Sequence, residues 1–417
     1  MLLRSNHFMP QQLPTAIVDA PKVPPQYRPA SSVPLRIFAA CLTSVLVAVH
    51  YTNFGPLIPT LITSLHINSA QTGLFSTFLF LGLAAMYIPG GMLADRYGER
   101  PVLIGSSILL VIGATLLPLF PNLTWVLACR FIVGLGSGAA FVAGAGVAAG
   151  LGKHASLGQG MYGGSVQVGS GLGLLLTPFL LAHFGWRGSF LVWGLLGIPL
   201  IVTWIFVNDA YEAPETENAS AVAGIRSPAV WTLGLSHMGT FGLGNTIAAW
   251  IAVYLAFQYG LPLALAATLG SLALLSGMFF RPLGGILIDR KVIGAIPLLR
   301  FGTILGCLGV GLLALPLHFT PFAVIGITCI AIGATIPYTS VFNEAARLRT
   351  VSKGIAQGLV SVISSPTVLL GPPLIGFLFQ ETNNFTSAFG SILLFGFVAI
   401  TASFLAGPAV KRETSIS

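Results

Sequence analysis

The chain has 417 residues, of which 55% are hydrophobic and only 7% are charged, with 19 Lys and Arg against 11 Asp and Glu. Soluble proteins carry about 25% charged residues, so this chain lacks the ionic groups needed to cover a globular surface in water. The composition excludes a soluble enzyme and a disordered protein, and the long apolar runs exclude a porin-type barrel, which shows short alternating segments.

Apolar runs long enough to cross a bilayer follow a polar, proline-rich segment over 1–34, which we expect to be a flexible cytoplasmic tail. In the first half the runs cover 36–65, 71–94, 102–119, 123–148, 156–182 and 188–207. In the second half they cover 229–258, 263–288, 295–317, 321–343, 355–379 and 385–408. The pattern predicts an all-α integral membrane protein with about twelve transmembrane helices.

An acidic stretch separates the two sets of runs and predicts a cytoplasmic linker over 208–227. The expected organisation is therefore a six-helix bundle over 35–207, a second six-helix bundle over 228–409, and a cytoplasmic tail over 410–417.

The basic residues indicate how these helices are oriented. With the N-terminus in the cytoplasm, sixteen of the 19 Lys and Arg residues fall in cytoplasmic segments, and the outer loops hold only Arg187. The remaining two, Arg130 and Arg281, lie within predicted spans. We therefore expect a multi-pass protein of the cell (inner or plasma) membrane with both termini in the cytoplasm.

Two motifs recur in the two halves. Residues 50–55 (HYTNFG) return as 237–242 (HMGTFG), and residues 90–96 (GGMLADR) return as 284–290 (GGILIDR). Two similar halves joined by a linker are typical of transporters that move one bundle against the other around a site near the middle of the membrane.

The second repeat also carries a family resemblance. Residues 91–100 (GMLADRYGER) resemble the loop signature of the major facilitator superfamily, G-x-L-x-D-R-x-G-R/K-R/K, from which only Glu99 departs. Residues 130–136 (RFIVGLG) resemble the family's R-x-x-Q-G-x-G, and residues 185–187 (GWR) are another common feature. The resemblance implies the major facilitator fold, with two six-helix pseudo-repeats that work by alternating access.

Charged residues and glycines at the ends of the second and eighth helices are candidate gating groups. A charge-assisted network there can hold the cytoplasmic side closed in one state and release it in another, and the glycines let a neighbouring helix approach closely. The alternative is a solvated turn whose positive charge only orients the helices. The candidates are Gly91, Asp95, Arg96 and Arg100 in the first half, and Gly285, Asp289 and Arg290 in the second.

The charges inside the membrane indicate the charge of the substrate. None of the 11 acidic residues lies in the middle of a predicted span, whereas Arg130 and Arg281 do. An arginine at the centre of a membrane helix costs at least ~2.5–3.5 kcal/mol on insertion scales. An anion would supply the missing partner, and the guanidinium fork suits an oxyanion or carboxylate.

Arg281 has the stronger case for binding. Residues 281–285 (RPLGG) resemble the eighth helix of nitrate/nitrite porters, where R-P-x-G-G supplies a substrate-binding arginine, and the seventh helix is also similar to cyanate permease-like proteins. Tyr87 stands where nitrate porters have a second arginine, so we expect a larger monoanion with an apolar or aromatic body rather than nitrate. For Arg130, hydrogen bonding across helices is as good an interpretation as binding.

Other polar or aromatic residues in the spans are weaker candidates for the substrate site. Histidine titrates in the physiological range, so either of two histidines could carry a coupling proton, or both could be pore-lining hydrogen-bonding groups. These candidates are His50, His237, Asn53, Asn245 and Trp250.

The sequence therefore favours a secondary active transporter that moves a small or organic anion, by proton-coupled uptake or by anion exchange. One alternative is a proton-coupled efflux antiporter for drugs or metabolites. Another is a non-transporting membrane receptor or enzyme, for which no catalytic motif is present. We expect a monomer in the bilayer whose partners are the anion and a coupling proton, with no enzyme activity, metal, cofactor or nucleic acid.

Overall fold

The computed structural model describes residues 31–149, 155–208, 221–316, 319–349, 351 and 353–415, and all regular secondary structure in them is helical. Eleven helical segments in this part of the chain are long and apolar enough to cross a membrane. One of them, Gly158–Phe206, has 49 residues, and at about 1.5 Å per residue it is more than twice as long as the roughly 30 Å hydrocarbon core. Gly185 breaks it with φ 65° and ψ −179°, so it supplies two crossings and brings the total to the predicted twelve.

The first half begins with a crossing built from three short pieces, followed by longer helices. Its elements are α1 (Val33–Thr52), η1 (Gly55–Leu57), α2 (Ile58–Leu65), α3 (Ser69–Tyr97), α4 (Glu99–Leu116), η2 (Leu117–Leu119), α5 (Leu123–Ala149), α6 (Ala155–Leu195) and α7 (Gly197–Phe206). Asn68 and Gln71 form a reciprocal cap that begins α3, because each side chain bonds the backbone N–H of the other.

The second half has the same plan with more interruptions. Its elements are α8 (Ala221–Arg226), α9 (Pro228–His237), the π-helical turn η4 (Met238–Gly242), α10 (Leu243–Tyr259), α11 (Leu263–Leu275), α12 (Gly277–Asp289), α13 (Ala295–Leu313), α14 (Thr320–Thr335), α15 (Tyr338–Ala346), α16 (Lys353–Ile363), α17 (Pro366–Thr382) and α18 (Phe385–Ser415). Every predicted span overlaps one or more of these helices, so the predicted all-α membrane fold is confirmed.

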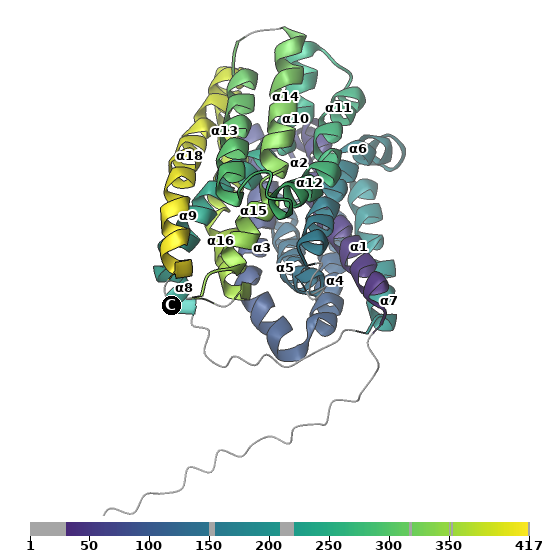
Figure 1. The fold of residues 1–417 in the computed structure, drawn as a ribbon. Coiled ribbons are helices and arrows are strands. Elements are labelled where there is room, and N and C mark those ends of the chain that lie inside the picture. The colour runs from purple at the N-terminus through teal and green to yellow at the C-terminus, as the bar shows by residue number, and fades with distance from the viewer. Residues whose placement is uncertain are drawn as a thin grey trace, which may run out of the picture.

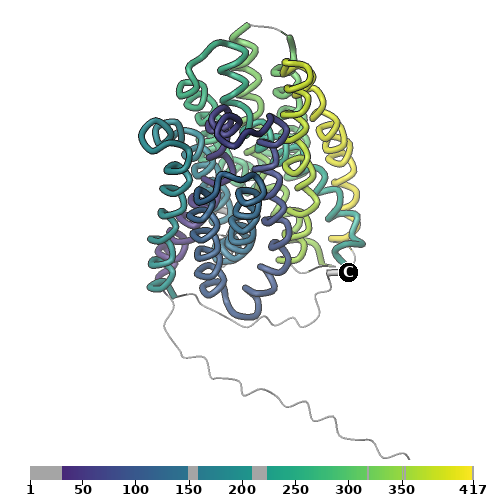
Figure 2. Tube along the Cα trace, turned by 180° about the vertical axis from the view of Figure 1, so that it is seen from behind, coloured from purple at the N-terminus to yellow at the C-terminus, as the bar shows by residue number. Residues whose placement is uncertain are grey.

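The helices of each half lie together, and the halves stand side by side (Figures 1 and 2). Across the boundary α3 packs against α17, while α6 packs against α11 and α12. The start of α1 and the end of α18 lie at the same end of the molecule (Figure 1).

At the opposite end one apolar cluster joins side chains of both halves, among them Phe54 and Leu57 from the first and Ile247 and Trp250 from the second. The halves are therefore closely packed at the end away from the termini.

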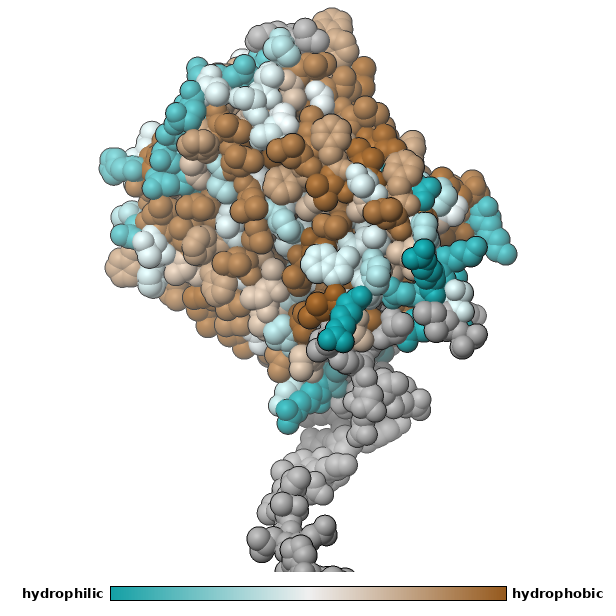
Figure 3. Space-filling model, turned by 90° about the vertical axis from the view of Figure 1, so that its left-hand side faces the viewer, coloured by the Kyte–Doolittle hydropathy of each residue, from teal (hydrophilic) through white to brown (hydrophobic). Residues whose placement is uncertain are grey.

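Large apolar side chains also cover the outside. Phe206 is 76% exposed, Phe279 68% and Leu394 67%, and apolar residues dominate the middle of the face in Figure 3, with hydrophilic ones towards its ends. An apolar belt of this kind is stable in lipid and not in water.

The C-terminal segment continues the last helix. The tail predicted over 410–417 is helical through Ser415, where the description ends, and Glu413 in it is buried. Its carboxylate accepts hydrogen bonds from Ser227 Oγ (2.7 and 2.9 Å) and from the Ala229 N–H (3.0 Å). A helix N-terminus has unsatisfied N–H groups and favours a negative charge, so Glu413 caps α9. The predicted N-terminal tail up to residue 30 and linker residues 209–220 lie outside the described residues.

Candidate functional site

The first helix of each half breaks at the repeated histidine motif. α1 ends at Thr52 and continues through Asn53 and Phe54 into η1, whereas α9 ends at His237 and continues through the π turn into α10. Such π turns often mark functional positions. Both histidines are almost fully buried, so the repeat places two imidazoles at the breaks of paired helices.

Arg130 of α5 is fully buried, and each of its three side-chain nitrogens donates a hydrogen bond. Its Nε donates to the Phe75 carbonyl at 3.0 Å, one terminal nitrogen to Asn53 Oδ1 at 3.3 Å, and the other to the His50 carbonyl at 2.8 Å. Its guanidinium carbon also lies 5.4 Å from the centre of the Phe54 ring. Arg130 thus joins α5 to α1 and α3 through neutral acceptors, which supports the hydrogen-bonding interpretation of this residue.

Arg281 of α12 is 2% exposed and only partly bonded. One terminal nitrogen donates to the Gly163 carbonyl of α6 at 2.6 Å, and the guanidinium carbon stands 4.1 Å from the centre of the Tyr338 ring. Its Nε is buried and makes no hydrogen bond. Within the described residues no carboxylate forms a salt bridge with Arg281. A buried cation with an unused donor is unfavourable unless another group completes its shell.

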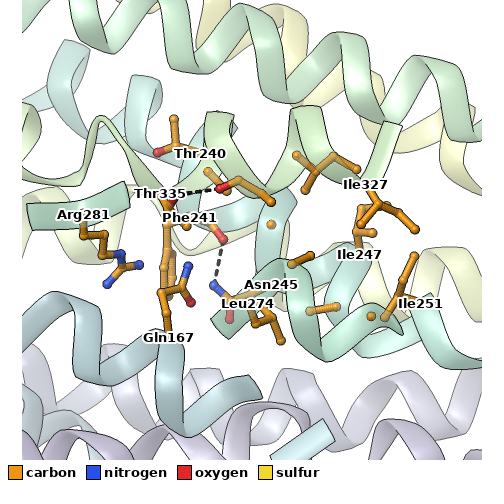
Figure 4. Close-up of a pocket in the computed structure, with 17 residues that line it drawn as sticks. Gln167, Thr240, Phe241, Asn245, Ile247, Ile251, Leu274, Arg281, Ile327 and Thr335 are labelled. Carbon is orange, nitrogen blue, oxygen red and sulfur yellow. Dashed lines mark hydrogen bonds between the residues drawn. The ribbon is translucent and has the colours of Figure 1, made fainter. Parts of the chain in front are cut away.

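Arg281 forms part of the wall of a central cavity (Figure 4). The polar side chains Gln167, Thr240 and Thr335 lie towards its end of the cavity, with Asn245 in between, and apolar side chains such as Ile327 lie at the other end. The cavity is lined by Gln167, Thr240, Phe241, Gly244, Asn245, Ile247, Ala248, Ile251, Gly270, Ala273, Leu274, Arg281, Ile327, Ile330, Ala331, Ala334 and Thr335. It therefore offers a positive, hydrogen-bonding end and an apolar end.

Tyrosines from both halves are among the groups near Arg281, and Tyr338 contacts it directly. Tyr51 and Tyr338 interact electrostatically with Arg281, and Tyr87 interacts with both tyrosines. All three rings are buried, and in the part of the chain that is described their hydroxyls make no hydrogen bond. Tyr51 from the first half and Tyr338 from the second thus bring unused phenol donors near Arg281.

Of the remaining predicted site residues Asn245, Asn53 and Trp250, only Asn245 lines this cavity. Asn245 lines it and donates to the Phe241 carbonyl at 2.9 Å. Asn53 instead bonds Arg130 and His50. Trp250 is fully buried, donates to the Pro372 carbonyl at 3.0 Å, and is not part of the cavity wall.

The predicted gating residues lie at the ends of α3 and α12 and at the start of α4. Asp95, Arg96, Asp289 and Arg290 are all exposed. Asp95 and Arg96 also interact with other residues. Arg100 donates through Nε to the Trp204 carbonyl at 2.9 Å, and so braces α4 against α7 within one half.

An equivalent arginine, Arg300, braces the second half. Its Nε donates to the Ser403 carbonyl at 3.0 Å and a terminal nitrogen to the Phe404 carbonyl at 3.2 Å. Pro408 lacks the N–H that would reach Phe404 in a regular helix, so Arg300 satisfies a carbonyl that the proline leaves free.

In each glycine pair the residue that permits close helix packing is the first one. A Cβ on Gly90 would lie 2.8 Å from Ala139 Cα, and a Cβ on Gly284 would overlap the Ile336 carbonyl. For Gly91 and Gly285 the corresponding contacts are 3.4 Å and 3.5 Å, which are ordinary packing distances.

Sequence reasoning missed Gln167, Thr335 and Tyr338 as site residues. Tyr338 follows Pro337 after α14, and nothing in its local pattern shows that it stacks on Arg281. Gln167 stands in a glycine-rich stretch of α6, and an amide side chain among glycines was the signal that could have identified it, although Gln159 in the same stretch gives the same signal.

Comparisons with known proteins agree with this architecture. A family model described as Major Facilitator Superfamily matches residues 40–365. The probable sulfoacetate transporter SauU of Cupriavidus necator is 24% identical over 392 residues, which cover 86% of this chain and 91% of that protein. The nitrite extrusion protein of Bacillus subtilis is 24% identical over 342 residues, covering 80% and 84%. These relatives are transporters, not enzymes, and they confirm the likeness to the nitrate/nitrite porter group.

A solved structure shows the same fold. The bacterial homologue of the human lysosomal transporter Spinster, in an inward-facing and occupied conformation, superposes with a TM-score of 0.73 at 18% identity, covering 93% of this chain and 100% of that one. The family match spans more than half of the sequence and the fold agrees along its length, so the chain belongs to the Major Facilitator Superfamily.

Proposed function

We propose that this chain is a secondary active transporter that carries a small organic anion by alternating access, with Arg281 as the cation that binds it. The observation that carries the proposal is the state of Arg281: it is buried, it lines the cavity, and its Nε has no hydrogen-bond partner. Charge-assisted hydrogen bonds to an anionic oxygen would satisfy that donor and offset the burial of the charge.

The comparison with Arg130 supports this assignment. Arg130 donates from all three of its side-chain nitrogens to protein acceptors, and it is not part of the cavity wall. Of the two arginines within the membrane, Arg281 alone combines a free donor with a place in the cavity wall.

The shape of the cavity favours an anion with an apolar body. Its polar end holds Arg281 and Gln167, and its other end is lined by Ile247, Ile251 and Ile327 (Figure 4). Two relatives carry the names of anion transporters, one for sulfoacetate and one for nitrite. Tyr87 in place of a second arginine weakens the case for nitrate, because a phenol contributes one donor and no charge.

Placement in the membrane follows from the basic residues. With sixteen of the 19 Lys and Arg residues on the same side as the termini, the positive-inside rule puts both termini in the cytoplasm. We propose that the chain acts as a monomer in the cell membrane, and that uptake is driven by protons or by anion exchange.

The test is uptake into proteoliposomes of nitrate, nitrite, cyanate and sulfoacetate, measured for the wild type and for Arg281→Gln. Arg187→Gln is the matched control, because Arg187 is exposed and stacks on Trp186 away from the cavity. We expect saturable transport of at least one anion in the wild type and in Arg187→Gln, and its loss in Arg281→Gln. Wild-type transport by Arg281→Gln would remove the assignment of the site.

A further inference from the structure

The repeated histidines have different neighbours three residues further along. His50 Nδ1 lies 3.3 Å from Asn53 Nδ2, and His237 Nδ1 lies 3.0 Å from Thr240 Oγ1. Asn53 and Thr240 occupy the same place in the repeat, so one half offers an amide and the other a hydroxyl. The difference determines which ring nitrogen of each histidine carries the proton.

Arg130 fixes the orientation of the Asn53 amide. A guanidinium has only donors, so the atom of Asn53 that faces it at 3.3 Å must be the carbonyl oxygen Oδ1. The NH₂ group of Asn53 then faces His50 and donates to Nδ1. An Nδ1 that accepts a hydrogen bond carries no proton, so the neutral His50 ring is protonated on Nε2.

His50 is therefore held in its neutral form. A second proton would have to go on Nδ1, where it would face the Asn53 NH₂ group, donor against donor. The Nε2 atom is buried and has no hydrogen-bond partner. Arg130, which donates to the His50 carbonyl at 2.8 Å, also places a fixed positive charge beside this residue, and nearby positive charge disfavours imidazolium.

The hydroxyl next to His237 has the opposite effect. Thr240 donates its one hydroxyl proton to the His237 carbonyl at 3.1 Å, as threonine commonly does within a helix. The oxygen then presents a lone pair to the ring, so His237 Nδ1 is the donor and Nε2 is the free base. A proton can add to Nε2 without breaking either hydrogen bond. Unlike Nε2 of His50, Nε2 of His237 is not a buried atom without a hydrogen-bond partner.

Arg281 is the charged group that acts on His237. The His237 ring has Phe241, Phe342 and the titratable Tyr338 as aromatic neighbours, with ring centres 5.5, 5.3 and 6.3 Å away. The guanidinium carbon of Arg281 lies 4.1 Å from the centre of the same Tyr338 ring, so His237 and this buried positive charge share a neighbour.

Among the side chains that the structure describes, the other charged groups of the elements packed against α9 are exposed or have partners elsewhere. Arg226 of α8 and Lys411 and Arg412 of α18 are exposed. Glu344 of α15 pairs with Arg347, Glu413 of α18 bonds Ser227 and Ala229, and Arg300 of α13 bonds α18 carbonyls. Arg281 therefore remains as the charge that opposes a proton on His237.

We infer that His237, and not His50, binds the coupling proton, and that it does so when an anion occupies Arg281. The inference rests on the proposed anion site. An anion on Arg281 cancels the charge that repels imidazolium, so Nε2 takes up one proton as the anion binds and loses it as the anion leaves. By linkage, the proton must favour anion binding by the same factor.

The transport test uses His237→Asn and His50→Asn in proteoliposomes, with the panel of nitrate, nitrite, cyanate and sulfoacetate. Asparagine is the matched substitution at both places, because its amide nitrogen can replace the Nδ1 donor of His237 and its oxygen can replace the Nδ1 acceptor of His50. Two readouts are compared for each variant: accumulation driven by a pH gradient, and exchange of labelled for unlabelled anion without a gradient.

We expect His237→Asn to lose accumulation driven by the pH gradient while it still exchanges anion. His50→Asn keeps the dependence on the gradient, whatever its rate. Gradient-driven accumulation by His237→Asn, or its loss in His50→Asn alone, would overturn the inference. If the wild type carries no anion of the panel, the proposed function fails instead.

A spectroscopic measurement decides the proton positions without any substrate. In the ¹⁵N-histidine-labelled protein in nanodiscs, with signals assigned from the two asparagine variants, we expect an Nε2–H ring for His50 and an Nδ1–H ring for His237. Only the His237 signal should move towards imidazolium as the pH falls, and addition of a transported anion should shift that midpoint upwards. Titration of His50 with a constant His237 would contradict the inference.

Discussion

Arg130 and Arg281 are the two buried arginines of the membrane interior, and they differ in how their donors are used: Arg130 bonds three protein acceptors, and Arg281 bonds one. The acceptors of Arg130 are two backbone carbonyls and an amide that itself holds His50. The one acceptor of Arg281 is the Gly163 carbonyl of the other half. Arg130 is therefore part of the framework of its half, and Arg281 is a contact that can change when the halves move.

The two arginines should respond differently when their charge is removed. Arg130→Met leaves buried acceptors unpaired, at about 1–3 kcal/mol each, and should lower the melting temperature in detergent. Arg281→Met removes a buried charge that few groups satisfy, and should leave that temperature unchanged or raise it. Thermal unfolding of the two variants side by side checks this, and the reverse order of stability would contradict it.

The first glycine of each pair should be less tolerant than the second. A methyl group at residue 284 meets the Ile336 carbonyl, whereas one at residue 285 meets Thr339 Cγ2 at 3.5 Å. Overpacking of this kind costs about 1–3 kcal/mol, so Gly284→Ala should unfold at a lower temperature than Gly285→Ala. The pair Gly90→Ala and Gly91→Ala repeats the comparison in the first half, and equal stability within both pairs would argue against it.

Asp95 lies near the end of α3, outside the cavity wall, and takes part in an interaction there. If its charge network acts as a gate, Asp95→Asn should insert normally and bind anion with wild-type affinity, yet transport it several-fold more slowly. Initial uptake rates and equilibrium binding, measured on the same preparation, separate the two steps. Wild-type rates would show that the charge serves only to orient the helices.

Glu413 should hold the end of α18 against the start of α9. Glu413→Gln keeps the size of the side chain but weakens charge-assisted bonds to Ser227 and to the Ala229 N–H, each worth about 1.5–3 kcal/mol. We expect faster proteolysis within 410–415 in this variant than in the wild type. Lys411→Gln, a change of an exposed neighbour, is the control. Equal cleavage of all three proteins would mean that the cap does not hold this segment.

Much of the fold follows from the sequence, because hydropathy and span length are local properties. The twelve crossings, the acidic break between the halves and the recurrence of 50–55 at 237–242 need no long-range information. The length of α18 does not follow from the sequence in the same way, because 410–415 contain charged residues and are predicted to be a cytoplasmic tail. Only the contact of Glu413 with α9 shows why they stay helical.

The candidate site was predictable in part. Arg281 follows from an uncompensated charge in an apolar run, and its place in the cavity wall agrees with that. Tyr338 and Gln167 come from α15 and α6, and only the packing of one half against the other brings them to Arg281. For Arg130 and the two histidines, the decisive facts are hydrogen-bond directions, which a linear pattern does not contain.

The most direct test of the central claim is the equilibrium affinity of the purified transporter for the anion that it carries best, with Arg281→Gln compared to the wild type and to Arg187→Gln. A hydrogen bond to a charged group is worth about 1.5–3 kcal/mol, so the dissociation constant of Arg281→Gln should rise roughly 10- to 100-fold, while Arg187→Gln binds as the wild type does. Wild-type affinity in Arg281→Gln would contradict the account.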